Sequence, residues 1–344
     1  MQLPREVIVG SEIFERIGEV CGRLGFKKSA LIVAGSKTYD VAGKTVKTLL
    51  EEEGMKVDTL LVESATIKDA QVVEEKIKVL KPQVVFGVGG GTKIDVAKLS
   101  SANQKVPFIS VPTTASHDGI ASPVSSVKGF EKPYSVMAEA PIAIIADTDI
   151  IMRAPRRFVI SGCGDVIAKF TAVKDWKLAH EIKNEYYGEY AASLALMSAK
   201  LVMQNAEFIK PDEEEGVRVL LEALISCGVA MSIAGSSRPC SGSEHLFSHA
   251  LDMTASNHAM HGEQCGVGTI MMAYLHRANW RRIRDTLKRL GAPTNADELG
   301  VEKKDVVEAL VAAPTIRPER YTILNKVNLG RRASEKLAKK TEVI

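Results

Sequence analysis

The sequence predicts a two-domain α/β protein in which a doubly wound parallel sheet precedes an all-helical domain. From residue 6 to about residue 147, short β-branched runs alternate with longer amphipathic runs, as they do in parallel βα units. After Met152 this alternation gives way to long runs rich in Ala, Leu and Met, which are typical of packed helices. A chain of 344 residues that is 45% hydrophobic can fill two cores. We place the boundary near Ile150, so that the domains are residues 1–150 and 151–344.

The expected strands are short β-branched runs bounded by turn or helix signals. They are Val7–Val9, Ala30–Ala34, Val57–Val62, Val84–Val88, Phe108–Val111 and Ile142–Ala146. The expected helices have apolar residues at helical spacing. They are Lys37–Glu53, Ile67–Leu80, Tyr190–Phe208, Val217–Ile233 and the basic terminal segment Gly330–Lys340. The stretch Ala313–Pro318 contains two prolines and is expected to be a loop.

A glycine-rich loop, Gly89-Gly-Gly-Thr-Lys93, follows the expected fourth strand and opens a helix at about Thr92. Glycines let a backbone approach a phosphate closely, and the free N–H groups of a helix start attract its negative charge. The loop therefore predicts phosphate binding. The alternative is a tight strand-to-helix turn, for which two glycines would be enough. It is not the ordinary G-x-G-x-x-G fingerprint, because Thr92 occupies the third glycine position.

Two histidines of one expected helix and a third beyond it indicate a metal site. If Glu244–Met253 is helical, His245 and His249 lie four residues apart on one face. The polar segment Thr254–His258 is expected to be a loop that returns the chain to His261, at the start of another helix. Convergent imidazoles suit zinc, and a catalytic zinc takes three protein ligands and keeps one position open.

The best candidate for the remaining metal ligand is Asp165. It follows two glycines in Ser161-Gly-Cys-Gly-Asp165 and is expected at the opening of an apolar helix. The alternative is that this carboxylate only caps the helix, since carboxylates are favoured near helix N-termini. The paired histidines favour the ligand. A second polar loop, Val111–Pro123, leaves the carboxyl edge of the sheet, where open α/β sheets bind their ligands.

These motifs resemble one superfamily. Gly-Ser-Glu-His-Leu-Phe-Ser-His, with His-Gly-Glu beginning sixteen residues after the first His, is similar to the metal site of glycerol dehydrogenases, iron-type alcohol dehydrogenases and 3-dehydroquinate synthases. The loop Ala115–Pro123 lacks the Ser-x-Gly-Gly-Lys-Thr type of the synthases and the Gly-Thr-Gly-Ser-Glu type of the iron enzymes. It looks most like that of the archaeal sn-glycerol-1-phosphate dehydrogenases, and glycerol dehydrogenases carry a related loop. The resemblance covers nearly the whole chain and implies a dehydroquinate synthase-like fold.

By this resemblance each polar motif acquires a role. The implied metal ligands are Asp165, His245 and His261, and the implied substrate-facing residues are Asp118 and His249. The implied contacts to the nicotinamide cofactor are Gly89, Gly90, Gly91, Thr92, Lys93, Thr113, Thr114 and Ser122, with Asp95 assisting through hydrogen bonding. His117 is left outside the site as a candidate surface residue.

The implied reaction is reversible hydride transfer from NAD(P)H to dihydroxyacetone phosphate. The product, sn-glycerol 1-phosphate, is the backbone of archaeal membrane phospholipids. Zinc is expected to act as a Lewis acid on the carbonyl, and iron or nickel suits the same ligands. The alternatives are a glycerol dehydrogenase acting on unphosphorylated substrates, a lyase of the dehydroquinate synthase kind that recycles tightly bound NAD, and a non-catalytic nucleotide-binding protein.

Two details stay open at this level. The substrate phosphate needs a cationic partner, and Lys169, Arg238 and Arg317 are candidates that are equally readable as solvated surface charges. For the cofactor, Glu63 favours NAD by holding a ribose diol, whereas Lys37 favours NADP by receiving the extra phosphate.

Composition excludes several classes. A net charge of +3, a pI near 8.4 and the absence of aromatics interleaved with basic runs argue against a nucleic-acid partner. Five scattered cysteines without a C-x-x-C pair are expected to be mostly buried thiols. No apolar leader follows the amino terminus, and no segment is expected to approach the length of a membrane span. We expect a cytoplasmic protein without membrane insertion that forms a homo-oligomer.

Overall fold

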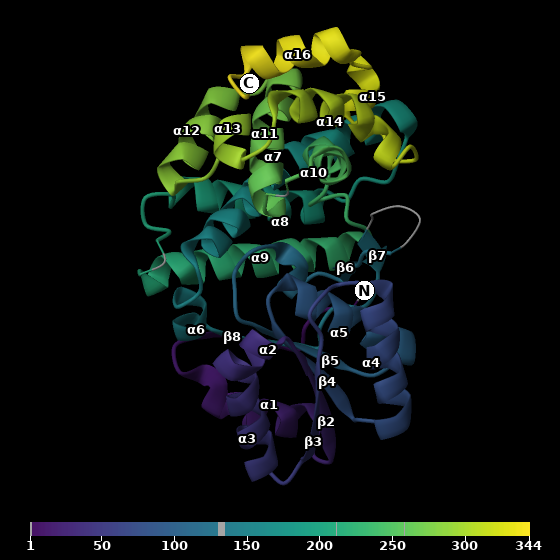
Figure 1. Cartoon of the computed structure of the whole chain (residues 1–344), viewed down its shortest axis with the longest axis vertical. Coiled ribbons are helices and arrows are strands. Elements are labelled where there is room, and N and C mark those ends of the chain that lie inside the picture. The colour runs from purple at the N-terminus through teal and green to yellow at the C-terminus, as the bar shows by residue number, and fades with distance from the viewer. Residues whose placement is uncertain (1, 130–134, 211, 258) are drawn as a thin grey trace.

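The computed structural model describes residues 2–129, 135–210, 212–257 and 259–344. Its first half is a parallel sheet covered by helices on both faces, and its second half is an assembly of helices (Figure 1). The fold class expected from the sequence is therefore confirmed. His258, which the sequence assigns to the loop before His261, lies outside the described residues.

All six expected strands are present and form a single parallel sheet in the order β1-β8-β5-β4-β2-β3. They are β1 (Glu6–Gly10), β2 (Ser29–Ala34), β3 (Lys56–Leu61), β4 (Val84–Gly89), β5 (Phe108–Pro112) and β8 (Ala143–Asp147). In the register of the two central strands Gly89 is opposite Pro112. The glycine-rich loop and the loop after β5 therefore leave the same edge of the sheet side by side.

The sheet is buried on both faces, as is usual for parallel sheets. Helices α1 (Ile17–Leu24) and α3 (Lys44–Glu52) cover one face, and α4 (Ile67–Leu80) and α5 (Gly91–Gln104) cover the other (Figure 1). Successive residues of β2 accordingly join different cores. Because both faces are apolar, the central strands β2, β4, β5 and β8 consist mainly of hydrophobic residues, whereas the edge strand β3 also contains Lys56, Asp58 and Thr59.

The expected helix over Lys37–Glu53 is interrupted. The chain forms a short turn of helix, α2 (Ser36–Thr38), then a π-helical segment, η2 (Tyr39–Gly43), and only then α3. A Cβ on Gly43 would lie 2.5 Å from the Tyr39 ring, so the glycine makes room for that side chain. A short antiparallel hairpin, β6 (Val124–Ser126) with β7 (Ser135–Met137), was not expected. Its strands are too short to give a visible alternation of apolar and polar residues.

The second half of the chain is helical throughout its described residues apart from connecting loops and turns. Its helices are α6 (Thr148–Met152), α7 (Arg156–Lys183), α8 (Glu189–Gln204), α9 (Glu214–Ala234), α10 (Ser243–Thr254), α11 (His261–Leu275), α12 (Trp280–Leu290), α13 (Ala296–Leu299), α14 (Lys303–Ile316), α15 (Ile323–Val327) and α16 (Arg331–Lys340). The helices expected over 190–208 and 217–233 are confirmed as α8 and α9, and the terminal helix as α16.

Two expectations about this half are wrong. Residues 313–316 are not a loop but the last turn of α14, which continues through Pro314. Ala313 and Ile316 are buried on the same face as Leu310, so burial of that face holds the turn in place. The second error concerns α9, which is long and apolar enough to span a membrane. More than half of its apolar stretch is buried inside the molecule, and Figure 1 shows it lying between the sheet and the other helices.

Candidate active site and metal centre

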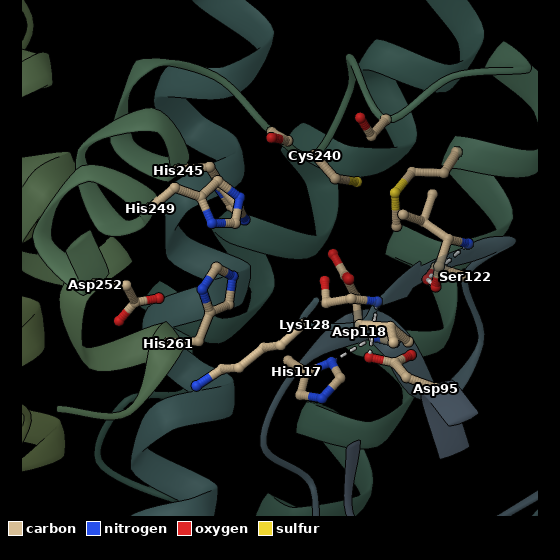
Figure 2. Close-up of a pocket in the computed structure, with 17 residues that line it drawn as sticks. Asp95, His117, Asp118, Ser122, Lys128, Cys240, His245, His249, Asp252 and His261 are labelled. Atoms are coloured by element: carbon tan, nitrogen blue, oxygen red, sulfur yellow. Dashed lines mark hydrogen bonds between the residues drawn. The ribbon is translucent and has the colours of Figure 1, made fainter. Parts of the chain in front are cut away.

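A pocket of about 220 Å³ lies between the carboxyl edge of the sheet and the helical half. From the sheet side it is lined by the loop after β5 and the hairpin strand β6, and from the helical side by α10, α11 and the segment before α10 (Figure 2). Among its lining residues are Asp118, Ser122, His245, His249 and His261. The structure therefore gathers sequence-predicted site residues that lie up to 143 positions apart (118 to 261) around one cavity.

Helices α7 and α11 meet at a backbone-to-backbone contact beside this pocket. A Cβ on Gly164 would lie 2.1 Å from the carbonyl oxygen of Gly262, and a Cβ on Gly262 would lie 1.8 Å from that of Ser161. Only glycine permits so close an approach. Asp165 and His261 adjoin these glycines in sequence. The crossing therefore brings the two side chains to the same place.

This arrangement corrects the expectation for Asp165. The residue lies well inside α7, whose N-cap is Pro155, and not at the opening of a helix. The alternative role as a helix cap is wrong for the same reason. The two glycines before Asp165 lie inside α7 and permit close packing: Gly164 meets α11, and a Cβ on Gly162 would lie 2.0 Å from the carbonyl oxygen of Ala115.

The close approach makes a stability prediction. We expect Gly262→Ala to destabilise the protein by about 1–3 kcal/mol, because the added methyl group overlaps rigid backbone and forces the helices apart. Gly22→Ala in α1 is the matched control, since a Cβ there meets nothing within 4 Å. It should stabilise the protein by about 0.5–1 kcal/mol. Urea unfolding of both variants measures the difference, and equal midpoints would contradict the role of the glycine contact.

Asp165, His245 and His261 lie close together beside the pocket, and the two histidines line it. His245 Nε2 lies 3.4 Å from Asp165 Oδ1, and the His245 and His261 ring centroids are 5.0 Å apart. The ring of His249 stacks near His261 at 5.9 Å (Figure 2). A carboxylate and two imidazoles within this range match the donor types that zinc prefers.

The other nitrogen of each imidazole is held by a neighbouring side chain. His245 Nδ1 is 2.9 Å from Glu244 Oε1, and His261 Nδ1 is 3.1 Å from Ser248 Oγ. Ser248 in turn donates to Gln264 Oε1 at 2.6 Å. Metal-binding histidines almost always have their second nitrogen fixed in this way. The orientation of both rings is thus set by polar partners outside the pocket.

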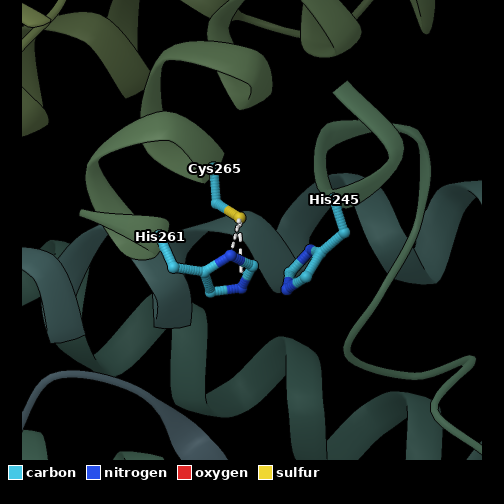
Figure 3. Close-up of side chains that lie close together, drawn as sticks. All are labelled: His245, His261 and Cys265. Carbon is cyan, nitrogen blue, oxygen red and sulfur yellow. Dashed lines mark hydrogen bonds between the residues drawn. The ribbon is translucent and has the colours of Figure 1, made fainter. Parts of the chain in front are cut away.

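Cys265 belongs to the same cluster and was not identified from the sequence. Its thiol lies 3.6 Å from His261 Nε2, and one donor atom each of His245, His261 and Cys265 lie within 4.8 Å of one another (Figure 3). Burial raises the pKa of this thiol, which favours the protonated form that binds metal poorly. Asp165 is ionised: burial alone would raise its pKa, but Lys169 and His245 hold it well below its usual range. We therefore retain Asp165 in the donor set.

Lys169 is a completely buried cation at this cluster and not a solvated surface charge. Its ammonium group lies 2.7 Å from Asp165 Oδ1 and 2.7 Å from Asp118 Oδ2. The backbone N–H of Asp118 also donates to Asp165 Oδ2 at 2.9 Å. Lys169 and Asp165 are one turn apart on α7, so both face the loop that carries Asp118. These contacts fix Asp118 at the rim of the pocket.

The glycine-rich loop lies beside these groups at the edge of the sheet. Helix α5 begins at Gly91, one residue before the expected start, and Gly89 has a φ of 156°. Thr113 N donates to Gly89 O at 3.0 Å, which joins the two loops. Thr114 Oγ1 is buried and has no hydrogen-bond partner among the described residues, and it would lie 3.1 Å from a Cβ on Gly90. An unsatisfied hydroxyl beside a glycine cradle suits a bound phosphate oxygen.

Other predicted residues of this loop region already have partners. Lys93 Nζ donates to Glu63 O at 2.9 Å, and Asp95 accepts from Lys98 at 3.1 Å. Ser122 Oγ donates to Val124 O at 3.1 Å. Thr92 is exposed at the start of α5. These side chains lie at the sheet edge, but only Ser122 and Asp95 line the pocket.

His117, which was left outside the site, lines the pocket and is half-buried. A Cβ on Gly91 would lie 1.7 Å from His117 Nε2, so the imidazole packs directly on the glycine-rich loop. Its Nδ1 accepts from Gly119 N at 2.9 Å. Arg238 does not lie on the surface either: it is buried and forms a bidentate ion pair with Glu185. All five cysteines are buried free thiols, as expected.

Known proteins with the same fold share this architecture. A glycerol dehydrogenase from Schizosaccharomyces pombe aligns over 100% of this chain and 93% of its own, with a TM-score of 0.79 at 20% identity. A 1,3-propanediol oxidoreductase aligns over 98% of both chains, also with a TM-score of 0.79, at 16% identity. Identities this low establish the common fold alone.

Sequence similarity is more specific. Residues 8–155 match the iron-containing alcohol dehydrogenase family. The glycerol-1-phosphate dehydrogenase [NAD(P)+] of Methanosarcina mazei is 56% identical over 344 residues, covering 100% of this chain and 96% of that protein. The enzyme of the same name from Pyrococcus furiosus is 55% identical over 100% of this chain and 99% of its own. Because identity of this degree extends from end to end, the chain belongs to the glycerol-1-phosphate dehydrogenase family.

Proposed function

We propose that this protein reduces dihydroxyacetone phosphate reversibly to sn-glycerol 1-phosphate with NAD(P)H, and thereby supplies the glycerophosphate backbone of membrane phospholipids. The observation that carries the proposal is that His245 and His261 line a pocket together with loops at the carboxyl edge of the sheet, and that Asp165 lies 3.4 Å from His245 behind them. The names of the family relatives support the substrate and the cofactor. We also propose that residues 1–150 and 151–344 are two domains with the site between them, in a cytoplasmic homo-oligomer.

The donor set fits a zinc ion held by Asp165, His245 and His261. One carboxylate and two imidazoles leave a position for substrate oxygen. Zinc supplies a Lewis acid to the substrate carbonyl when it is bound there. Iron or nickel fits the same donors, so which metal the protein binds depends on the supply of each metal in the cell as well as on the geometry of the site. Glu244 and Ser248 keep the imidazoles oriented.

The cofactor pyrophosphate is proposed to bind at the glycine-rich loop. Gly89, Gly90 and Gly91 let it approach the backbone, and the unsatisfied Thr114 hydroxyl is available to donate to it. Thr92 and Lys93 of the same loop, with Thr113 and Ser122 of the neighbouring loop, complete the proposed contacts. A nicotinamide cofactor held by these residues would supply hydride to a substrate in the neighbouring pocket.

Asp118 and His249 are proposed to orient the substrate. Asp118 is half-buried at the pocket and is held by Lys169, so its remaining oxygen can accept a hydrogen bond from a substrate hydroxyl group. Burial, together with the charges of His245, Arg317 and Arg320, lowers the pKa of His249 to about 3. Its imidazole is therefore neutral near pH 7, and it can hold or pass a proton without adding charge beside a metal ion.

Absorbance at the nicotinamide band with dihydroxyacetone phosphate and with dihydroxyacetone, measured in parallel, tests the proposal. We expect steady NAD(P)H consumption that is much faster with the phosphorylated substrate. Faster consumption of dihydroxyacetone would instead indicate a glycerol dehydrogenase. Absence of consumption with either substrate would reject the proposal and favour a lyase that recycles its cofactor.

A further inference from the structure

The pocket has an unusual charge distribution. Of the residues that line it within the described part of the chain, Lys128 is the sole lysine or arginine. Its lining acids are already engaged: Asp95 by Lys98, Asp118 by Lys169, and Asp252 by the Gln264 amide. The Lys128 ammonium group, by contrast, has neither an ion-pair partner nor a hydrogen-bond acceptor in the described structure.

The backbone of Lys128 is nevertheless firmly placed. Its N–H donates to Ala65 O at 2.8 Å, and its carbonyl accepts from Ile67 N at 2.8 Å. These bonds hold Lys128, the second residue after β6, against the segment that leads from β3 into α4. Figure 2 shows the side chain extended along the pocket, toward the side where His261 and Asp252 lie in that view. The backbone of Lys128 is therefore held in place while its ammonium group is available at the pocket, which suits it to bind an anion from solution.

We propose that Lys128 binds the phosphate group of the substrate. This inference rests on the proposed function, because it identifies the subsite that distinguishes dihydroxyacetone phosphate from dihydroxyacetone. A lysine provides three donors and a compact charge for a phosphate dianion. Binding the phosphate at Lys128 on the sheet side leaves the carbonyl end of the substrate for the cluster of Asp165 and the histidines.

The other cations lie off the pocket, and Arg317, a candidate from the sequence, is not among its lining residues. Three further buried cations are bonded elsewhere. Lys169 is wholly buried and bonded to two carboxylates. Arg238 is paired with Glu185 and also donates to Tyr321 O at 3.0 Å. The guanidinium group of Arg320 donates to Ser241 O and Ser237 Oγ. None of these three side chains lines the pocket.

The test compares Lys128→Met with wild type on both substrates. Loss of a charge-assisted contact should raise KM for dihydroxyacetone phosphate by about 10- to 100-fold. KM for dihydroxyacetone, which has no phosphate, should change by less than about twofold, and Lys128→Arg should recover most of the loss. Lys68→Met is the matched control, because Lys68 is an exposed lysine on α4 that does not line the pocket. It should leave both KM values within about twofold of wild type.

Equal changes for the two substrates, or no change for either, would overturn the assignment while leaving the proposed function intact. If wild type reduces neither substrate, the proposed function itself has failed. The subsite is then decided by calorimetric titration with inorganic phosphate. Binding at least about tenfold weaker in Lys128→Met supports the subsite, and equal binding removes it.

Discussion

His261→Ala is expected to release the metal and to lower turnover with dihydroxyacetone phosphate by at least about 100-fold, while the protein stays folded. Mutating a residue that only hydrogen-bonds to a metal ligand typically lowers metal affinity or activity 10- to 100-fold, so loss of a ligand itself should lower them at least as much. The fold should survive because His261 is the first residue of α11 and is only half-buried. Its ring contributes little to the packing of the helix behind it.

Metal content by elemental analysis, far-ultraviolet circular dichroism and turnover measure the three parts of this expectation. His180→Ala is the control, since His180 is an exposed histidine at the far end of α7. It should keep the metal and the activity. Chelation of wild type should abolish turnover, and added zinc should restore it. Full activity of His261→Ala, with metal retained, would eliminate the proposed centre.

Lys169→Met is expected to destabilise the metal-free protein by about 3–5 kcal/mol. Methionine fills nearly the same space but removes the ammonium group that both Asp118 and Asp165 contact, and removing one partner of a buried ion pair costs about this much. The effect should be reduced in the double variant Lys169→Met with Asp118→Asn, because one of the repelling charges is then removed. Asp118→Asn alone serves as the reference for that comparison.

Urea unfolding of the metal-free proteins at neutral pH gives these differences. Lys78→Met provides a control for the loss of a lysine charge, since the ion pair of Lys78 with Glu75 lies on the exposed surface and contributes little to stability. A change below about 1 kcal/mol for Lys169→Met would mean that water or proton uptake compensates the two carboxylates.

The sheet was predictable because its strands are buried on both faces. Runs without polar residues, such as Val84–Val88, are the pattern expected of strands buried on both faces. Local spacing likewise predicted α10 and the return of the chain to His261. Elements with little burial of their own, such as the β6–β7 hairpin, left no comparable signal.

The site was predictable in its residue types but not in its packing. The sequence does not distinguish glycines that form a turn before Asp165 from glycines that let another helix pack closely. The contact with the distant Gly262 shows that they allow close packing. Nothing local to Lys169 indicates that it is buried between two carboxylates. Cys265 was within reach of sequence reasoning, since it lies one helical turn after His261 and so shares its face.

The contact between Gly164 and Gly262 limits how the family can diverge. In most helix crossings a bulky replacement on one side can be accommodated later by a smaller residue opposite. Here each glycine faces a main-chain carbonyl group of the other helix, which a smaller side chain at the opposing position cannot remove. Compensation would have to move a whole helix, which would also separate the acid from the imidazole. We therefore expect natural variation around the metal to accumulate in the supporting partners, and the two glycines to change last.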